Sequence, residues 1–247
     1  MKRPIFLAVM LLCMMPRSFA IEPVWAINVS AGFDFVGATQ RNFDFIRAFR
    51  SNETISGARD KTIGTYHLSI MPECYLTDKF SLSTGLRVTS AGSHFNSDYS
   101  FFYFKAKEEG LNTYYFRINS IQQENVYVGV PLEFRFTLRG DGRPSPYFRC
   151  GTTFNFRCTT KSTINYTKRY HDPTASIDSK DIPTADNFTL PVYCAAGCQF
   201  GHHNSFSVEI TFPYLVLAGS MSGMHFSDGL GGGLRMTYQF LKTKSEN

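Results

Sequence analysis

Hydrophobic and polar residues alternate along most of this chain with a period of two. Successive side chains of a β-strand point to opposite faces, so this alternation predicts strands that each have one apolar face. The segment from Trp25 to Phe35 shows the pattern first, with apolar residues at odd positions and small or polar residues at even ones. Seven more segments repeat it, at residues 66–76, 80–88, 126–138, 148–156, 188–200, 206–214 and 230–240. None of the eight apolar faces carries a charged residue.

The connections between these segments alternate between short and long. Short turns are predicted at residues 77–79, 139–145 and 201–205, and polar loops at 39–61, 91–123, 161–186 and, shorter, 215–228. This rhythm is typical of an up-and-down antiparallel barrel whose two rims face different compartments. Four prolines fall inside the predicted strands, where we expect bulges or rims because proline cannot donate to the ladder. They are Pro72, Pro131, Pro191 and Pro213.

The composition of the two faces indicates which one is outside. A soluble lipocalin-like barrel would turn its apolar face inward. Here the polar faces contain no lysine and are rich in Gly, Ser and Thr, which suits a narrow, crowded interior. Aromatic residues at the strand ends predict two girdles at the membrane interfaces. The periplasmic girdle would hold Trp25, Phe80, Phe148, Phe200, Phe206, Tyr238 and Phe240, and the outer one Phe35, Tyr66, Phe156, Phe188 and Tyr214. The sequence therefore predicts an all-β, eight-stranded transmembrane β-barrel with long extracellular loops.

With this orientation, four acidic and four basic residues point into the lumen. We expect them to pair with one another and with Tyr127, Tyr193, Asn155 and Gln199, because unpaired charges in a dry interior are costly. Eight strands leave an interior just wide enough for side chains. The expected barrel is thus plugged and not an open pore. The predicted lumen charge network is Asp34, Glu73, Arg87, Glu133, Arg135, Arg149, Glu209 and Arg235.

The first twenty residues are typical of a secretory signal peptide. Lys2 and Arg3 precede a short apolar run, and Ser18-Phe19-Ala20 forms a small-x-small cleavage site. We expect residues 1–20 to be removed and 21–247 to form the barrel in the outer membrane of a Gram-negative bacterium. Without Lys2, Arg3 and Arg17 the formal charge falls from +5 to +2, so the alkaline pI indicates no affinity for nucleic acid.

Candidate catalytic and metal-binding residues are few. Cys194 and Cys198 would lie about 13 Å apart on one strand face, too far to share an ion, and we interpret the cysteines as small hydrophobes. His67 and Ser69 share one face and could begin a hydrolytic dyad if an acid oriented the histidine. No nucleophile motif supports catalysis, so we expect a structural histidine. The sequence predicts no enzyme activity, no metal site and no cofactor.

Two aromatic and basic loop segments are candidate binding surfaces. The first could grip a partner, a glycan or a lipid, or could equally be two strands that extend the barrel beyond the bilayer. The residues concerned are Phe101, Phe102, Tyr103 and Phe104 in one loop and Tyr166, Lys168, Arg169 and Tyr170 in the other.

Several segments resemble the PorT-type outer-membrane β-barrel family. Residues 127–134 resemble that family's Tyr-Leu-Glu-Ile-Pro-Leu strand, residues 146–151 its Pro-Tyr-x-x-x-Gly strand, and residues 76–86 its periplasmic hairpin. Gly129 departs from the family's usual Glu or Gln, and seven residues follow Phe240 where such barrels usually end on an aromatic. The resemblance implies an outer-membrane location. The founding member of the PorT-type family takes part in protein secretion.

Four functions follow from these observations. The leading one is a non-enzymatic barrel that displays surface loops for structural, adhesive or binding roles. The second is an accessory component of an outer-membrane protein-secretion machine, the third a small passive channel, and the fourth a membrane-embedded hydrolase or acyltransferase. The expected partners are the lipid bilayer, barrel-assembly proteins and, in the second case, secretion-machinery proteins.

Overall fold

The computed structural model describes residues 24–40, 46–48, 61–96, 102–107, 113–138, 144–166, 182–201 and 204–241. The predicted signal peptide at 1–20 lies outside these ranges. Among the described residues, no helix is long and apolar enough to span a membrane. The strands are β1 (Val24–Gln40), β2 (Ile46–Ala48), β3 (Lys61–Tyr75), β4 (Phe80–Thr84), β5 (Leu86–Asn96), β6 (Phe102–Lys107), β7 (Thr113–Thr137), β8 (Ser145–Tyr166), β9 (Phe188–Phe200), β10 (Asn204–Ala218), β11 (His225–Phe226) and β12 (Gly231–Leu241).

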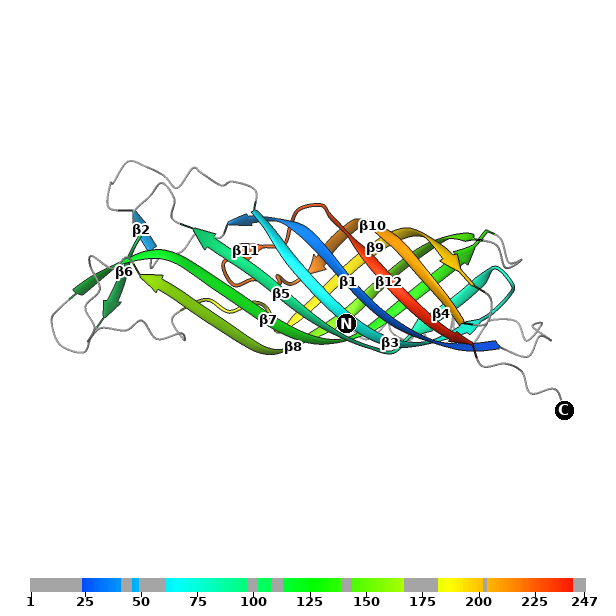
Figure 1. The fold of residues 1–247 in the computed structure, drawn as a ribbon. Helices are drawn as coiled ribbons and strands as arrows, with labels where there is room; N and C mark the ends of the chain where they lie inside the picture. Colours follow the sequence, from blue (N-terminus) through cyan, green and yellow to red (C-terminus); the bar gives the residue numbers. More distant parts are fainter. Residues whose placement is uncertain are drawn as a thin grey trace, which may run out of the picture.

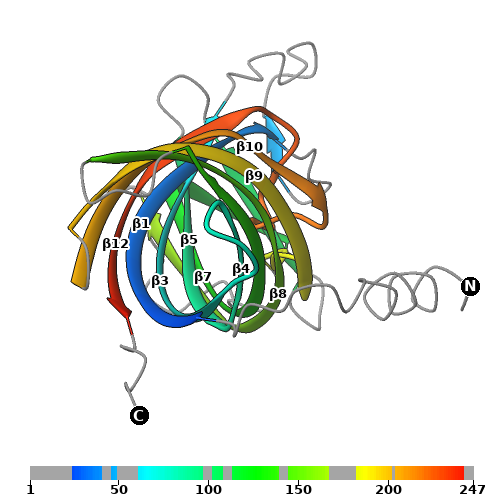
Figure 2. The same ribbon diagram turned by 90° about the vertical axis from the view of Figure 1, so that its right-hand side faces the viewer.

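Eight antiparallel strands close into a ring (Figures 1 and 2). We call each of these eight wall positions a stave, because one of them is formed by two successive strands, β4 and β5. Around the ring, β1 pairs with β3, followed by β4 and β5 as one stave, then β7, β8, β9, β10 and β12, which pairs with β1 again. β4 and β5 separate at Gly85, which lies opposite Pro131 in the β7 register, where no N–H is available for the ladder. The predicted eight-stranded antiparallel barrel is confirmed.

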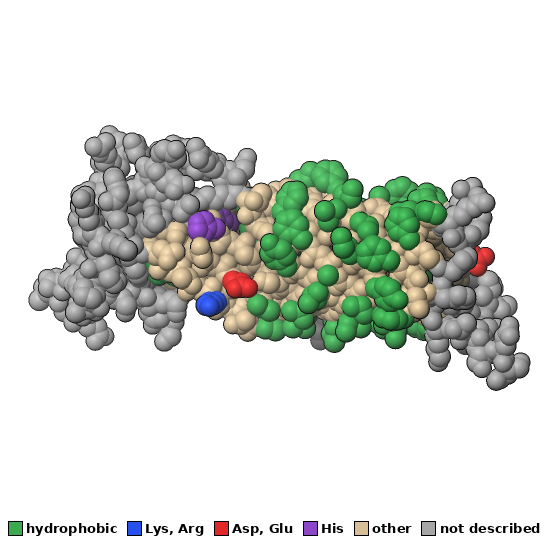
Figure 3. All heavy atoms as spheres, in the orientation of Figure 1, with side chains coloured by type: hydrophobic (Ala, Val, Ile, Leu, Met, Phe, Trp, Pro, Cys, Tyr) green, Lys and Arg blue, Asp and Glu red, His purple; other side chains and the backbone are tan. Residues whose placement is uncertain are grey.

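The outer wall is apolar and the interior polar. Leu68, Tyr66 and Ile210 are 66, 64 and 62 % exposed, whereas serines, threonines and charged groups fill the interior. Hydrophobic side chains cover the middle of the barrel in Figure 3, and the charged side chains visible there lie beyond the ends of this belt. A soluble carrier would need the opposite arrangement, so the wall is that of a barrel embedded in lipid.

Eleven of the twelve girdle aromatics lie on the outer wall as predicted. Tyr214 is the exception: its side chain is 5 % exposed and lies in the lumen. The register of β10 against both of its neighbours shifts between Thr211 and Tyr214, on either side of Pro213. One bulged residue reverses the faces that follow, because the side-chain period is two.

The expectation of bulges holds for two of the four prolines. Pro213 lies between Thr211 and Tyr214, where the register of β10 shifts, and Pro191 of β9 pairs with Val216 where the β10–β9 register shifts again. Pro72 and Pro131 stay within continuous strand registers, opposite Ile27 and Thr153. The hydroxyl of Thr84 donates to the Pro131 carbonyl at 2.8 Å, which provides a cross-strand bond where the ladder lacks one.

Two strands continue well past the apolar belt. β7 has 25 residues and β8 has 22, and their pairing runs up to Ile118 and Tyr166. β6 pairs with the start of β7, and β2 pairs with β6, so the first two long loops contribute strands beyond the apolar belt (Figure 1). We call β2, β6 and the parts of β7 and β8 beyond the belt the raised sheet. The aromatic loop segment was predicted either to bind a partner or to form two strands that extend the barrel. The backbone of β6 and of the start of β7 forms such strands.

Mild oxidation should join Cys150 and Cys194 within one chain. The two residues are direct cross-strand partners in β8 and β9, and their sulfur atoms lie 2.9 Å apart on the outer wall. Copper-phenanthroline treatment of the purified barrel, followed by mass spectrometry of its peptides, should detect the cross-link. Cys158→Ser should leave it intact, and Cys194→Ser should abolish it. A Cys150–Cys158 link instead would contradict the β8–β9 register.

Candidate functional site

The middle of the lumen is organised around one fully buried carboxylate. Glu133 of β7 forms ion pairs with three arginines: Arg87 of β5 at 2.6 Å, Arg149 of β8 at 2.7 Å and Arg235 of β12 at 2.6 Å. The hydroxyl of Tyr193, on β9, donates to the same carboxylate. Each group points inward because alternation places it there, so five staves meet at one residue.

A second carboxylate shares these arginines. Glu209 of β10 pairs with the Arg235 Nε and lies 3.3 Å from the Arg149 Nε. The hydroxyl of Tyr147 donates to Glu209 at 2.9 Å. Hydrogen-bonded networks of this kind hold buried charges that would each be very unfavourable alone. Tyr147 was not among the predicted network residues, although it directly precedes the 148–156 segment and its odd position is that of the inward side chains there.

A separate cluster lies toward the short turns. Glu73 accepts hydrogen bonds from Asn28 at 2.7 Å and Gln239 at 2.6 Å, and also from Ser81. Arg135 lies 3.9 Å from the Glu73 carboxylate, and its guanidinium stacks 3.9 Å from the centre of the Tyr147 ring while it donates to Gln199. Polar side chains therefore cross the lumen here too.

Asp34 is the one predicted network member that pairs outside the arginine set. Its carboxylate lies 3.2 Å from Nδ1 of His67, and Gly32 leaves the space that the imidazole occupies. The acid that a hydrolytic dyad would require is thus present. The Ser69 hydroxyl, however, pairs with Ser30 at 2.5 Å, and all four polar side chains are buried in the barrel. The arrangement is a pair of packed side chains inside the lumen.

Two of the four neutral partners expected in the network lie elsewhere. Tyr193 and Gln199 contact its charged groups, as described above. Tyr127 donates instead to the Asp186 carbonyl at 3.4 Å, and the Asn155 Oδ1 has no hydrogen-bond partner among the described residues.

An apolar layer and an inward-folded segment close the outer half of the lumen. Val36, Ile63, Tyr127 and Tyr214 are among the residues that form a buried cluster there, and Met221 completes it. Met221 belongs to the segment Ser220–His225, in which every residue is buried. The predicted polar loop over 215–228 starts later than expected, because β10 runs to Ala218, and its residues Ser220–His225 turn into the lumen.

Hydrogen bonds to the wall hold this inward segment. The Asn125 side chain donates to the Met221 carbonyl at 2.9 Å, and the Gly223 N–H donates to the Gln123 side chain at 2.7 Å. Ser93 and Ser222 share a hydrogen bond of 2.8 Å. The segment closes the lumen at a second level, above the arginine–carboxylate network.

The predicted loop-binding residues are only partly placed. Phe102, Tyr103 and Phe104 lie in the backbone of β6, and Tyr166 ends β8. The other four lie outside the described residues: Phe101, Lys168, Arg169 and Tyr170. Among the described residues there is no group of three or more side chains suited to a metal ion.

Comparison with known proteins identifies no family. No family model matches the chain, and no curated protein matches it. Among solved structures, it is similar to the outer membrane protein OprG from Pseudomonas aeruginosa, at 11 % sequence identity and a TM-score of 0.35, over 87 % of this chain and 95 % of that one. The closed ring of strands, the apolar wall and the charged lumen are by themselves the architecture of an outer-membrane β-barrel protein.

Replacing the central carboxylate should destabilise the barrel strongly. Glu133→Gln removes the carboxylate that Arg87 pairs with and leaves Arg149 and Arg235 to share Glu209, and breaking a buried pair costs about 3–5 kcal/mol. Urea unfolding in lipid vesicles, followed by heat-modified gel mobility, measures the loss. Glu124→Gln is the matched control, because Glu124 is exposed and its carboxylate accepts a hydrogen bond from the Ser90 hydroxyl at 3.0 Å on the outer wall. Equal unfolding midpoints for the two variants would contradict a central role for Glu133.

Proposed function

We propose that this chain is a non-enzymatic outer-membrane barrel that acts through its outer surface, as a membrane-anchored binding scaffold. The observation that carries the proposal is the closed lumen. Glu133 and Arg149 lie in the middle of the lumen and are 0 and 1 % exposed, which supports a barrel filled by its own side chains. A solute would have to displace both the charge network and the segment Ser220–His225. Passive conduction is therefore the weaker hypothesis.

The raised sheet supplies a surface for this role. Above the last β8–β9 pair, Phe156 with Phe188, β8 continues to Tyr166 and pairs only with β7 among the described residues. A strand edge of this kind can accept an extended segment of another protein by main-chain hydrogen bonding. This feature favours a protein partner over a small solute.

The raised sheet also supports the alternative of a secretion-machine component. The resemblance to PorT-type barrels implies that role, and a closed barrel with a protein-binding edge suits an accessory component as well as an adhesin. The two roles differ in the partner, which a capture experiment identifies. A lone surface partner favours the scaffold, and co-purification of a large envelope complex favours the secretion component.

The purified barrel should not conduct ions. In planar bilayers we expect no discrete current steps, because two separate levels of side chains close the lumen. A variant lacking residues 221–224 should also stay silent, since the Glu133 network lies below the deleted segment. A general porin in the same bilayers is the positive control. Reproducible steps from the unmodified chain would overturn the closed-barrel proposal.

Disrupting the upper end of β8 should abolish partner capture while the barrel still folds. We suggest replacing residues 162–166, which pair only with β7 among the described strands, with Gly-Pro-Gly-Pro-Gly, because proline cannot donate main-chain hydrogen bonds. Pull-down from detergent-solubilised envelopes compares this variant with the full chain, and heat-modified gel mobility checks folding. The matched control is Asp78→Ala with Lys79→Ala, in the exposed turn after β3 at the opposite end. Undiminished capture by the β8 variant would show that this strand edge is not the binding surface.

A further inference from the structure

Two strand glycines in the outer wall are not explained by packing. Of the fifteen glycines that the structure describes, thirteen have a neighbouring atom that an added Cβ would approach to 3.0 Å or less. At Gly64 and Gly92 the nearest atoms would lie 4.0 and 3.9 Å away, and neither residue has a positive φ. Glycine weakens a strand interior and leaves it without a side chain to pack. The fold does not require glycine at these two positions.

The two glycines face each other, and Gly92 lines a groove on the outer wall. Gly64 of β3 is the direct partner of Gly92 of β5, and Gly92 is the partner of Glu124 of β7. Glu124 is in turn the partner of Lys161 on β8. One row across four staves therefore reads Gly, Gly, Glu, Lys. A pocket of about 500 Å³ opens along this row, lined by Gly92, Glu124 and Lys161 and by Thr62 and Tyr66 on either side of Gly64.

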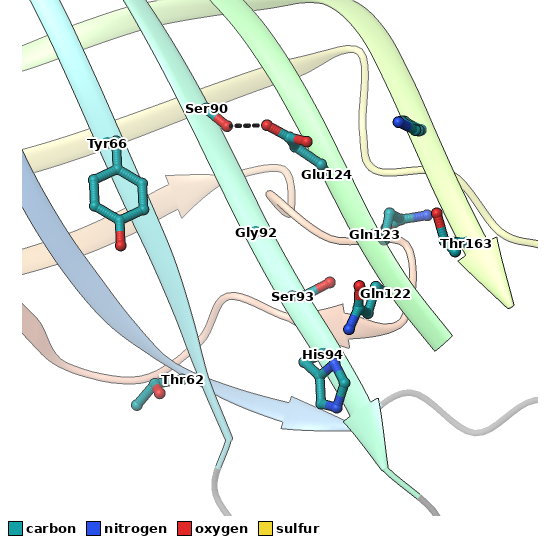
Figure 4. A pocket seen from close by; sticks show the side chains of 11 residues that line it. Thr62, Tyr66, Ser90, Gly92, Ser93, His94, Gln122, Gln123, Glu124 and Thr163 are labelled. Atoms are coloured by element: carbon teal, nitrogen blue, oxygen red, sulfur yellow. Dashed lines mark hydrogen bonds between the residues drawn. The ribbon is translucent and has the colours of Figure 1, made fainter. Parts of the chain in front are cut away.

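Polar side chains and one aromatic ring line this groove. On the side toward the belt lies Tyr66, next to Ser90, whose hydroxyl donates to Glu124 at 3.0 Å. On the opposite side His94 is paired with Gln122. Figure 4 shows the Tyr66 ring on one side of the Gly92 strand, and Glu124 and Gln122 on the other. The groove thus combines a flat apolar surface with carboxylate, amide, imidazole and hydroxyl groups.

This combination suits a saccharide. One face of a sugar ring presents C–H groups that pack against an exposed aromatic ring, and its hydroxyls both donate and accept hydrogen bonds. The carboxylate of Glu124 accepts, the ammonium of Lys161 donates, and the Gln122 amide does both.

The height of the groove indicates where such a saccharide would come from. Tyr66 belongs to the outer girdle. Leu68 is the next residue of β3 whose side chain faces the outer wall, and it is 66 % exposed within the apolar belt. The groove therefore begins where the hydrocarbon region ends, at the level of the headgroups of the outer leaflet. We propose that the groove over Gly64 and Gly92 binds the saccharide headgroup of an outer-leaflet glycolipid. The site shares the upper parts of β7 and β8 with the raised sheet, but it also needs β3 and β5 and does not rest on a protein partner.

Filling the groove tests the proposal without disturbing the fold. Gly64→Val with Gly92→Val places side chains in open space, so the barrel should fold and show its normal heat-modified mobility. The matched control is Ala196→Val, on an exposed position of β9 outside the groove. Both variants and the unmodified chain are reconstituted in nanodiscs that contain phosphatidylethanolamine and lipopolysaccharide. Native mass spectrometry then measures the lipopolysaccharide that remains bound when detergent releases the barrel.

We expect the unmodified chain and Ala196→Val to retain lipopolysaccharide, and the double glycine variant to retain at least tenfold less. A second arm titrates the unmodified chain with core oligosaccharide released from lipopolysaccharide by acid. Weaker binding of this free oligosaccharide than of the intact glycolipid supports a lipid-borne headgroup. Equal retention by the double glycine variant, or no retention by the unmodified chain, would overturn the site. Tight binding of the free oligosaccharide without retention of the glycolipid would overturn its assignment to the membrane. Partner capture by the raised sheet should be unchanged in every variant, so failure here is distinct from failure of the scaffold proposal.

Discussion

The buried carboxylate of Glu133 constrains the interior of this barrel more than any other group. Three arginines from three different staves converge on it, and two of them also contact Glu209. Isolated charges in such a place would be far more costly than the hydrogen bonds that satisfy them here, so the charged side chains must be present together. The same network fills the cross-section. The stability of the barrel and the closure of its lumen thus have one physical cause. With the lumen filled, the outer surface is the part of the barrel that a ligand or partner can contact.

Alternation was sufficient to predict the wall because lipid imposes it. Inside the membrane every second residue must be apolar, so the inward positions of Arg87, Glu133 and Arg235 could be inferred from their parity alone. The prediction for Tyr214 was wrong because the bulge after Thr211 reverses parity, and alternation carries no signal for a single inserted residue. Which carboxylate would meet which arginine also depended on stagger between staves, as the pairing of Asp34 with His67 shows.

Above the membrane the same reasoning no longer works. The upper half of β7 carries Gln122, Gln123, Glu124 and Asn125, which are polar on both faces because water replaces lipid outside. When both faces of a strand are polar, its sequence lacks the alternation that distinguishes a strand from a loop. Residues 91–123 were therefore predicted as a loop. The inward fold of Ser220–His225 is hidden for another reason. Its small and polar residues are satisfied by partners far away in sequence, such as Asn125, 96 residues before Met221.

Glycine shows how one residue type serves two purposes in the same wall. At Gly129 an added Cβ would clash with the side chain of Asn155, and at Gly151 it would press on Glu133, so these glycines make room for the lumen side chains. Gly64 and Gly92 make room for no side chain among the described residues, and the space beside them opens outward at the edge of the lipid belt. In a barrel whose interior is already filled, unoccupied volume on the outside is where a ligand can be accommodated. The closed lumen and the open groove therefore support the same proposal, a role at the membrane-facing and solvent-facing surfaces.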